Sequence, residues 1–246
     1  MILELDCGNS YIKWRLFSPV ASSVPVSGRA IDIEQLLDQV ATSAGRGLEK
    51  CRLVSVRSDS ETDAIALRIT SVFGLTVLRA MPATALGGVT NGYLEPGRLG
   101  LDRWLAMVAA FSLKRRACLV FDLGTAITVD LIATDGQHLG GFITPGVPLM
   151  RDQLFGHTRR IRYEGPAEGA LLREEAPGRS TAQAVEAGCL KMVRSYIGAQ
   201  MDAASTYLGS DFDVYATGGD ALLVADLPGI TCIPDLVFRG LAIACP

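Results

Sequence analysis

The order of apolar and polar positions predicts alternating strands and helices along most of the chain. Short apolar runs of strand length are found at 52–56, 76–79 and 213–216. Apolar residues that recur every three or four positions predict helices over 32–41, 60–73, 102–113, 147–155, 181–207 and 236–244. A chain that alternates in this way has an α/β fold.

One stretch near the middle of the chain combines strand signals with chemistry. An apolar run at 117–121 predicts a buried strand, and it is followed by Asp122, Gly124 and Thr125 before a second β-like run at 127–133. Gly124 allows a tight turn whose N–H groups can bind an anion, and Thr125 adds a hydroxyl donor. A carboxylate repels phosphate, so Asp122 makes sense if it holds a metal cation that phosphates also touch.

The same pattern is found at the N-terminus, where a strand leads into Asp6 and Gly8. The two copies lie about half the chain apart, which predicts two related halves, 1–115 and 116–246, facing each other across a nucleotide cleft. An Asp-x-Gly turn is also common in plain hairpins, so either copy alone is a weak signal. Lys13 can reach back to a β- or γ-phosphate, or it can be a solvated lysine on an edge strand.

The glycine- and proline-rich segment at 81–101 predicts a long functional loop or a small substrate-facing lobe. It ends directly before the helix predicted at 102–113. Asp102 is either a general base for a substrate hydroxyl or a plain first-turn acid of this helix. Arg103 either binds an anionic substrate group or only pairs with Asp102.

Three further segments carry turn or helix-end signals. We expect a second glycine-rich turn at 140–146, and a strand-to-helix turn at 217–219 that allows close approach of a flat group or serves structure alone. Ser180 and Gln183 predict a capping box at the start of the longest helix. Thr181 in its first turn is suited to meet a carboxylate, or it only supports the cap.

Composition and charge exclude several classes of function. Hydrophobic residues make up 49% of the 246 residues and charged residues 20%, which is typical of a globular chain. The net charge is −3 and there is no basic run, so we expect no nucleic-acid partner. The apolar runs are too short to span a bilayer, no secretory signal is expected, and six scattered cysteines without a Cys-x-x-Cys motif favour reduced thiols in the cytoplasm.

Taken together, these motifs resemble the superfamily of acetate kinase, sugar kinases, Hsp70 and actin. Its fold is a duplicated ribonuclease-H-like α/β domain with ATP in the cleft. Within it, the chain is similar to type III pantothenate kinases over nearly its full length. The similarity rests on Asp-Cys-Gly-Asn-Ser at 6–10, Asn-Gly-Tyr at 91–93, Gly-Leu-Asp-Arg at 100–103, Asp-Leu-Gly-Thr-Ala at 122–126 and Thr-Gly-Gly at 217–219. Ser10 departs from the threonine usual in the family but keeps the hydroxyl.

The resemblance implies ATP-dependent phosphorylation of pantothenate to 4′-phosphopantothenate, the first step of coenzyme A biosynthesis, with Asp102 as general base. It implies that ATP is bound by Asp6, Cys7, Gly8, Asn9, Ser10, Tyr11, Ile12, Lys13 and Thr125. It implies that the substrate is bound by Tyr93, Gly100, Leu101, Asp102, Arg103 and Thr181. Asp122 would bind the monovalent cation, potassium or ammonium, and Asp6 would bind Mg²⁺. The family is homodimeric, so Thr181 would act on the partner subunit's substrate.

Two other functions stay open at the level of sequence. One is another small-molecule kinase of the same superfamily that acts on a sugar or an acid. The other is a non-catalytic, nucleotide-dependent regulator or accessory factor. The presence of Asp102 favours an enzyme, and Tyr93 with Arg103 favours a substrate that carries a carboxylate.

Overall fold

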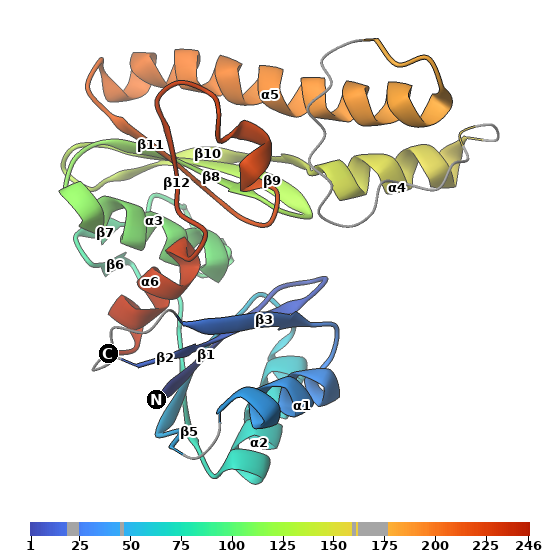
Figure 1. Cartoon of the computed structure of the whole chain (residues 1–246). Coiled ribbons are helices and arrows are strands. Elements are labelled where there is room, and N and C mark those ends of the chain that lie inside the picture. Colours follow the sequence, from blue (N-terminus) through green and yellow to red (C-terminus); the bar gives the residue numbers. More distant parts are fainter. Residues whose placement is uncertain (19–24, 45–46, 159–160, 162–176) are drawn as a thin grey trace. The chain divides into compact units, whose positions relative to one another are not determined.

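The computed structural model describes residues 1–18, 25–44, 47–158, 161 and 177–246 (Figure 1). The chain forms two compact units. One contains Met1–Ala109 together with Leu236–Pro246, and the other contains Ala110–Asp235. Each unit has one mixed five-stranded sheet with helices packed against it, which confirms the predicted α/β class.

The sheet of the first unit has the strand order β3-β2-β1-β4-β5. The strands are antiparallel from β3 to β1 and parallel from β1 to β5. Their bounds are β1 Ile2–Cys7, β2 Ile12–Phe17, β3 Val26–Ala30, β4 Lys50–Ser55 and β5 Thr76–Arg79. The predicted strand at 76–79 is confirmed, whereas the strand predicted at 52–56 begins two residues earlier and ends one residue earlier.

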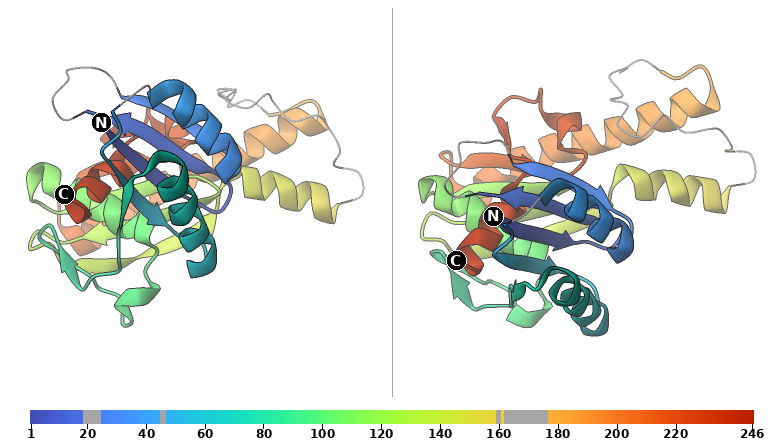
Figure 2. Two further views of the ribbon diagram at one scale, coloured as in Figure 1. Left: turned by 90° about the horizontal axis from the view of Figure 1, so that it is seen from below. Right: turned by 60° about the horizontal axis from the view of Figure 1, so that its bottom comes forward.

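Helices cover both faces of this sheet. On one face lie α1 (Ile33–Ala44) and α2 (Asp59–Phe73), and on the other lies α6 (Leu236–Ala244), which packs against β1 and β4 (Figures 1 and 2). In the core between the sheet and these two helices, alternate residues of β1 pack against the apolar face of α1. The predicted bounds of α6 are confirmed.

The N-terminus of α2 differs from the prediction that it begins at Ser60. Ser58 is the N-cap, and its Oγ accepts a hydrogen bond from the Glu61 N–H while the Glu61 carboxylate accepts one from the Ser58 N–H. This reciprocal pair satisfies two of the N–H groups that a helix start leaves without partners. The helix therefore begins at Asp59, one residue before the predicted start, because Glu61 takes the third helical position of the capping box only when Ser58 is the N-cap.

The segment between β5 and the next helix folds as a small lobe with short elements of its own. These are β6 (Ala85–Leu86), β7 (Val89–Thr90) and the 3₁₀ turn η1 (Pro96–Arg98). The lobe leads into α3 (Leu101–Lys114), whose first residues belong to the first unit and whose last residues belong to the second. Gly240 of α6 lies so close to the backbone of Leu105 that a Cβ would overlap it, so α6 and α3 cross at contact distance.

The second unit repeats the strand pattern of the first. Its order is β10-β9-β8-β11-β12, again antiparallel from β10 to β8 and parallel from β8 to β12. The bounds are β8 Cys118–Leu123, β9 Ala126–Ile132, β10 His138–Pro145, β11 Asp213–Thr217 and β12 Ile230–Cys232. Because the order and directions match strand for strand, β1 of the first unit corresponds to β8 of the second.

The segment at 140–146 is not a turn, as its glycines predicted. Residues 140–145 belong to β10, which pairs with β9 and carries a register irregularity between His138 and Gly140, and Gly146 is the N-cap of α4. β10 is an edge strand, and edge strands tolerate glycine and such irregularities better than central strands do. The turn expected after Thr217 leads into a short 3₁₀ helix, η2 (Ala221–Val224).

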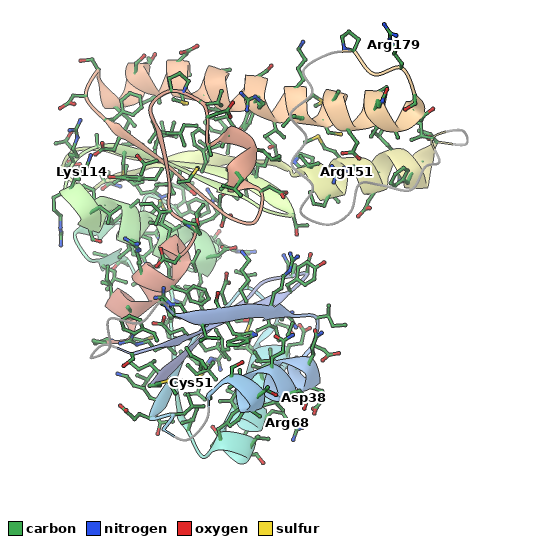
Figure 3. All side chains as sticks on the ribbon, in the orientation of Figure 1. Asp38, Cys51, Arg68, Lys114, Arg151 and Arg179 are labelled. Carbon is green, nitrogen blue, oxygen red and sulfur yellow. The ribbon has the colours of Figure 1, made fainter. Side chains whose placement is uncertain are left out.

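Two helices complete the second unit. The long helix α5 (Thr181–Leu208) packs on the sheet, and α4 (Val147–His157) lies alongside its N-terminal part (Figure 1). Arg151 of α4, labelled in Figure 3, forms an ion pair with the buried Glu186 of α5. Within the described residues, no helix has the length and apolar character needed to cross a membrane.

Candidate active site

Two acidic residues occupy equivalent places in the two sheets. Asp6 is the last but one residue of β1 and pairs with Lys13 of β2. Asp122 is the last but one residue of β8 and pairs with Thr128 of β9. Each strand pair is therefore a hairpin in which a carboxylate stands just before the turn.

The environment of Asp6 makes its carboxylate costly to ionise. The residue is 7% exposed, and burial raises its pKa to about 6. The ammonium of Lys13, 3.9 Å from Oδ2, opposes this rise, and the negative charge of Asp102 adds to it. Asp6 and Asp102 are thus two acids near one another, an arrangement that a divalent cation would stabilise.

Asp102 is held in one orientation by its own neighbours. It is the second residue of α3, and its Oδ1 accepts a hydrogen bond from the Arg103 N–H at 2.8 Å. A Cβ on Gly100 would lie 2.7 Å from this oxygen, so a larger residue there would displace the carboxylate. The Trp104 N–H donates to the Gly100 carbonyl at 2.9 Å and starts the helix. Asp102 is therefore a first-turn acid, and the same contacts orient its carboxylate for chemistry.

Arg103 is joined to the small lobe through Tyr93. The guanidinium, in a residue only 5% exposed, donates from Nη1 to the Tyr93 hydroxyl at 2.7 Å and lies 5.6 Å from the ring centre. Asn91 accepts from the Tyr93 N–H at 3.0 Å and donates to the carbonyls of Ala83 and Pro96. The lobe thus fixes a buried cation beside a phenol, and this combination suits a carboxylate ligand.

The turn predicted to bind ATP, at residues 6–13, can contact a ligand mostly through main-chain atoms. The side chains of Cys7 and Ile12 are fully buried, so these two residues can meet a ligand only through their backbone. Burial also raises the pKa of the Cys7 thiol to about 12, which leaves it unreactive. Asn9, Ser10 and Tyr11 are exposed in the turn between the two strands.

One residue at this turn was missed by sequence reasoning. The Nε of Arg57 donates a hydrogen bond to the carbonyl of Gly8 at 2.9 Å. Arg57 follows β4, which runs parallel to β1, and the Val56 N–H donates to the Cys7 carbonyl. Arg57 could have been found if the pairing of β1 with β4 had been known, because the residues that follow two neighbouring parallel strands lie at the same edge of the sheet.

In the second unit, glycines enclose the carboxylate of Asp122. Gly218 has a φ of +96°, and a Cβ on it would overlap both the Asp122 Oδ1 and the Leu123 carbonyl. A Cβ on Gly146 would overlap the Gly124 carbonyl, and the Gly146 N–H donates to the Thr125 carbonyl at 2.9 Å. Three segments therefore meet at the end of β8 with no room for side chains.

The atoms that could hold a cation at Asp122 are hard oxygen donors. Within the described ranges, no three His, Cys, Asp or Glu side chains are grouped to hold a metal. The Leu123 main-chain carbonyl lies beside the Asp122 carboxylate, and Thr125 is exposed in the same turn. One carboxylate with neutral oxygens suits a hard cation of low charge.

Thr181 is the exposed first residue of α5, in the second unit. Only one of the two hydrogen bonds of the predicted capping box is formed. The Ser180 Oγ accepts from the Gln183 N–H at 3.2 Å, but the Gln183 side chain accepts from the Arg179 N–H and not from Ser180. The other predicted substrate residues, from 93 to 103, belong to the first unit.

Comparison with solved structures agrees with this architecture. A protein from Campylobacter jejuni assigned to the Baf family of transcriptional activators aligns with a TM-score of 0.58 at 20% identity, over 98% of this chain and 95% of that one. The ethanolamine utilization protein EutJ from Carboxydothermus hydrogenoformans aligns with a TM-score of 0.55 at 12% identity, over 98% and 89%. Together with the repeated strand pattern, this shows a duplicated α/β fold, ribonuclease-H-like in each half.

Sequence comparison narrows the class to one family. The type III pantothenate kinase family model matches residues 2–203. A type III pantothenate kinase from Pseudomonas syringae is 54% identical over 248 residues, and one from Azotobacter vinelandii is 53% identical over 251 residues. Each alignment covers 100% of this chain and 99% of the relative. The chain belongs to the type III pantothenate kinase family and is a kinase.

Proposed function

We propose that this protein transfers the γ-phosphoryl group of ATP to pantothenate and so forms 4′-phosphopantothenate, the first step of coenzyme A biosynthesis. The observation that carries the proposal is the pair of neighbouring acids, Asp6 and Asp102, in a chain that matches this family over its full length. One acid can serve the metal and the other the substrate hydroxyl.

Asp102 is the proposed general base. The hydroxyl oxygen of pantothenate bonds to the γ-phosphorus, the bond from that phosphorus to the bridging oxygen breaks, and ADP leaves with that oxygen. The hydroxyl proton passes to the Asp102 carboxylate. Positioning and electrostatic stabilisation supply most of the acceleration in phosphoryl transfer; the Arg103 N–H orients this carboxylate, and Gly100 leaves room for it.

The turn from Asp6 to Lys13 is the proposed site for the phosphates of ATP. Its exposed residues offer N–H groups and a hydroxyl, and Lys13 offers an ammonium that is about half exposed. Asp6 would hold Mg²⁺, which neutralises phosphate charge when bound. In the second unit, Thr125 is a further proposed ATP contact, and Asp122 would hold potassium or ammonium.

The proposed substrate pocket uses Tyr93 and Gly100 to Arg103, where the buried guanidinium would bind the carboxylate of pantothenate. We also propose a homodimer in which Thr181 contacts the partner's substrate. Its exposure at the N-terminus of a 28-residue helix supports this role, since such an end favours anions. Six free cysteines support a reducing compartment, the cytoplasm.

Product analysis tests this proposal. The protein is incubated with Mg²⁺-ATP, potassium and either pantothenate, a panel of hexoses or a panel of hydroxy acids, and the products are identified by mass spectrometry. We expect a phosphorylated product with pantothenate alone. A phosphorylated sugar, or no product from a protein that still binds ATP, would favour the sugar-kinase or regulator function instead.

A further inference from the structure

We propose that Arg57 is a second phosphate-binding cation of the ATP site, in addition to Lys13. Its Nε holds the turn at Gly8, and its two outer guanidinium nitrogens bind the terminal phosphates of ATP. This inference rests on the proposed function, because it assigns a further residue to the same nucleotide site.

The sheet brings Arg57 to the turn. β1 and β4 are parallel, Cys7 is in register with Ser55, and the Val56 N–H donates to the Cys7 carbonyl at 3.2 Å. The chain after β4 therefore leaves the sheet beside the turn that follows β1. The carboxyl ends of parallel strands are where α/β sheets bind their ligands.

Local hydrogen bonds fix the base of the Arg57 side chain. Its own N–H donates to the Ser55 Oγ at 3.2 Å, and the same oxygen accepts a hydrogen bond from the Thr62 hydroxyl of α2 at 2.8 Å. The Nε then donates to Gly8 at 2.9 Å, and the side chain is half-buried. A guanidinium anchored by Nε presents its two outer nitrogens as a fork that matches phosphate oxygens.

Among the residues that the structure describes, Arg57 forms no salt bridge: its hydrogen bonds go to Ser55 and Gly8, and the exposed Glu61 carboxylate is within electrostatic range but makes no ion pair with it. Arginines with only structural roles are commonly paired with carboxylates, as Arg15 and Arg52 are here with Glu4. The half-buried guanidinium of Arg57, next to the turn proposed to bind phosphates, is suited to an anionic ligand. Lys13, 3.9 Å from Asp6, already has a carboxylate beside it.

The alternative is that Arg57 only supports the turn, and Arg57→Gln separates the two roles. The glutamine amide nitrogen lies the same number of bonds from Cα as the arginine Nε, so it can still donate to Gly8 but lacks the outer nitrogens. Arg57→Ala removes both. Arg68→Gln on α2, an exposed arginine labelled in Figure 3, is the control for loss of one positive charge.

The experiment measures dissociation constants for Mg²⁺-ATP and for AMP, with thermal unfolding of each variant. Loss of a charge-assisted contact is worth roughly tenfold or more in affinity, so we expect both Arg57 variants to bind ATP at least about tenfold more weakly. AMP binding should change by less than about twofold in Arg57→Gln, because AMP lacks the terminal phosphates, and its unfolding temperature should match that of the wild type.

Three results would overturn the inference. Wild-type ATP affinity in Arg57→Gln with weakened affinity in Arg57→Ala would assign Arg57 to turn support alone, and equal loss for ATP and AMP would show a general distortion. The test of Arg57 can be told apart from the test of the proposed function. If the wild-type protein binds ATP but does not phosphorylate pantothenate, the proposed function is wrong, and the ATP affinities of the Arg57 variants still test the role of Arg57. A wild-type protein that does not bind ATP overturns both.

Discussion

Asp6 at the end of β1 and Asp102 in the first turn of α3 lie close enough that the charge of Asp102 raises the pKa of Asp6. The two residues are far apart in the sequence, but β1 and the start of α3 belong to the same compact unit. Each has a separate support: Lys13 faces Asp6, and the Arg103 N–H holds Asp102.

Replacing Asp6 by asparagine should stabilise the metal-free protein at alkaline pH. The folded-state pKa of Asp6 is raised from 3.8 to about 6, so its favourable contribution is complete below pH 4 and is lost as the pH rises through 6. At pH 8 we expect Asp6→Asn to be more stable than the wild type by on the order of 2 kcal/mol, and at pH 4 the difference should vanish. Urea unfolding in EDTA at both pH values measures this.

Asp38→Asn is the control for that experiment, because Asp38 lies exposed on α1 (Figure 3). Its stability should follow the wild type at both pH values. An Asp6→Asn protein that is less stable than the wild type at pH 8 would show that the carboxylate is favourably paired in the fold. Turnover should be lost in Asp6→Asn whatever its stability.

Gly218 and Gly219 form a matched pair for testing the surroundings of Asp122. An alanine at 218 would need a φ of +96° and would overlap the Asp122 carboxylate, whereas a Cβ at 219 would meet no atom within 4 Å. We expect Gly218→Ala to cost about 2 kcal/mol or more and to remove any activation by potassium. Gly219→Ala should change neither, and equal effects of the two substitutions would contradict the close packing at Asp122.

Tyr93→Phe removes the hydroxyl that accepts from Arg103 while leaving the ring in place. If the two residues form the carboxylate pocket, the KM for pantothenate should rise by about tenfold, since one buried hydrogen bond to a charged group is worth 1.5–3 kcal/mol. The KM for ATP should stay within about twofold. Steady-state kinetics with each substrate varied measures both, with Arg98→Gln on the exposed 3₁₀ turn η1 as control. A rise in the KM for ATP instead would move Tyr93 out of the substrate pocket.

The sequence was sufficient for those features that depend on local pattern. Both hairpins that carry Asp6 and Asp122 form, the strand at 76–79 and the helix at 236–244 have the predicted bounds, and Asp102 is in the first turn of its helix. Each of these follows from apolar spacing or from turn and cap residues within about ten positions. The predicted division into halves at residues 115 and 116 stays a prediction.

Features set by long-range pairing could not be read from the sequence. The glycines at 140 and 141 suggested a turn, but pairing with β9 makes the segment an edge strand. Arg57 meets Gly8 only because β4 pairs with β1, and α6 packs on the first sheet although it ends the chain. The role of Gly218 beside Asp122 likewise depends on β11 being the neighbour of β8.

Asp102→Asn tests the assignment of the base. Removal of a general base costs about 10²–10⁴-fold in turnover, and we expect such a loss of kcat with unchanged ATP binding and an unchanged unfolding temperature. Asp59→Asn is the matched control, because Asp59 is also a first-turn acid, on the exposed start of α2. Turnover within a few-fold of the wild type in Asp102→Asn would remove Asp102 from the base role.

The most direct single measurement is pantothenate-dependent ADP release by the wild-type protein, with Mg²⁺-ATP and with or without potassium. The account predicts ADP release that requires pantothenate and rises when potassium is added. ADP release that requires pantothenate but does not depend on potassium would support the kinase activity and would contradict the proposed cation site at Asp122. No release with pantothenate, from a folded protein that binds ATP, would contradict the central claim.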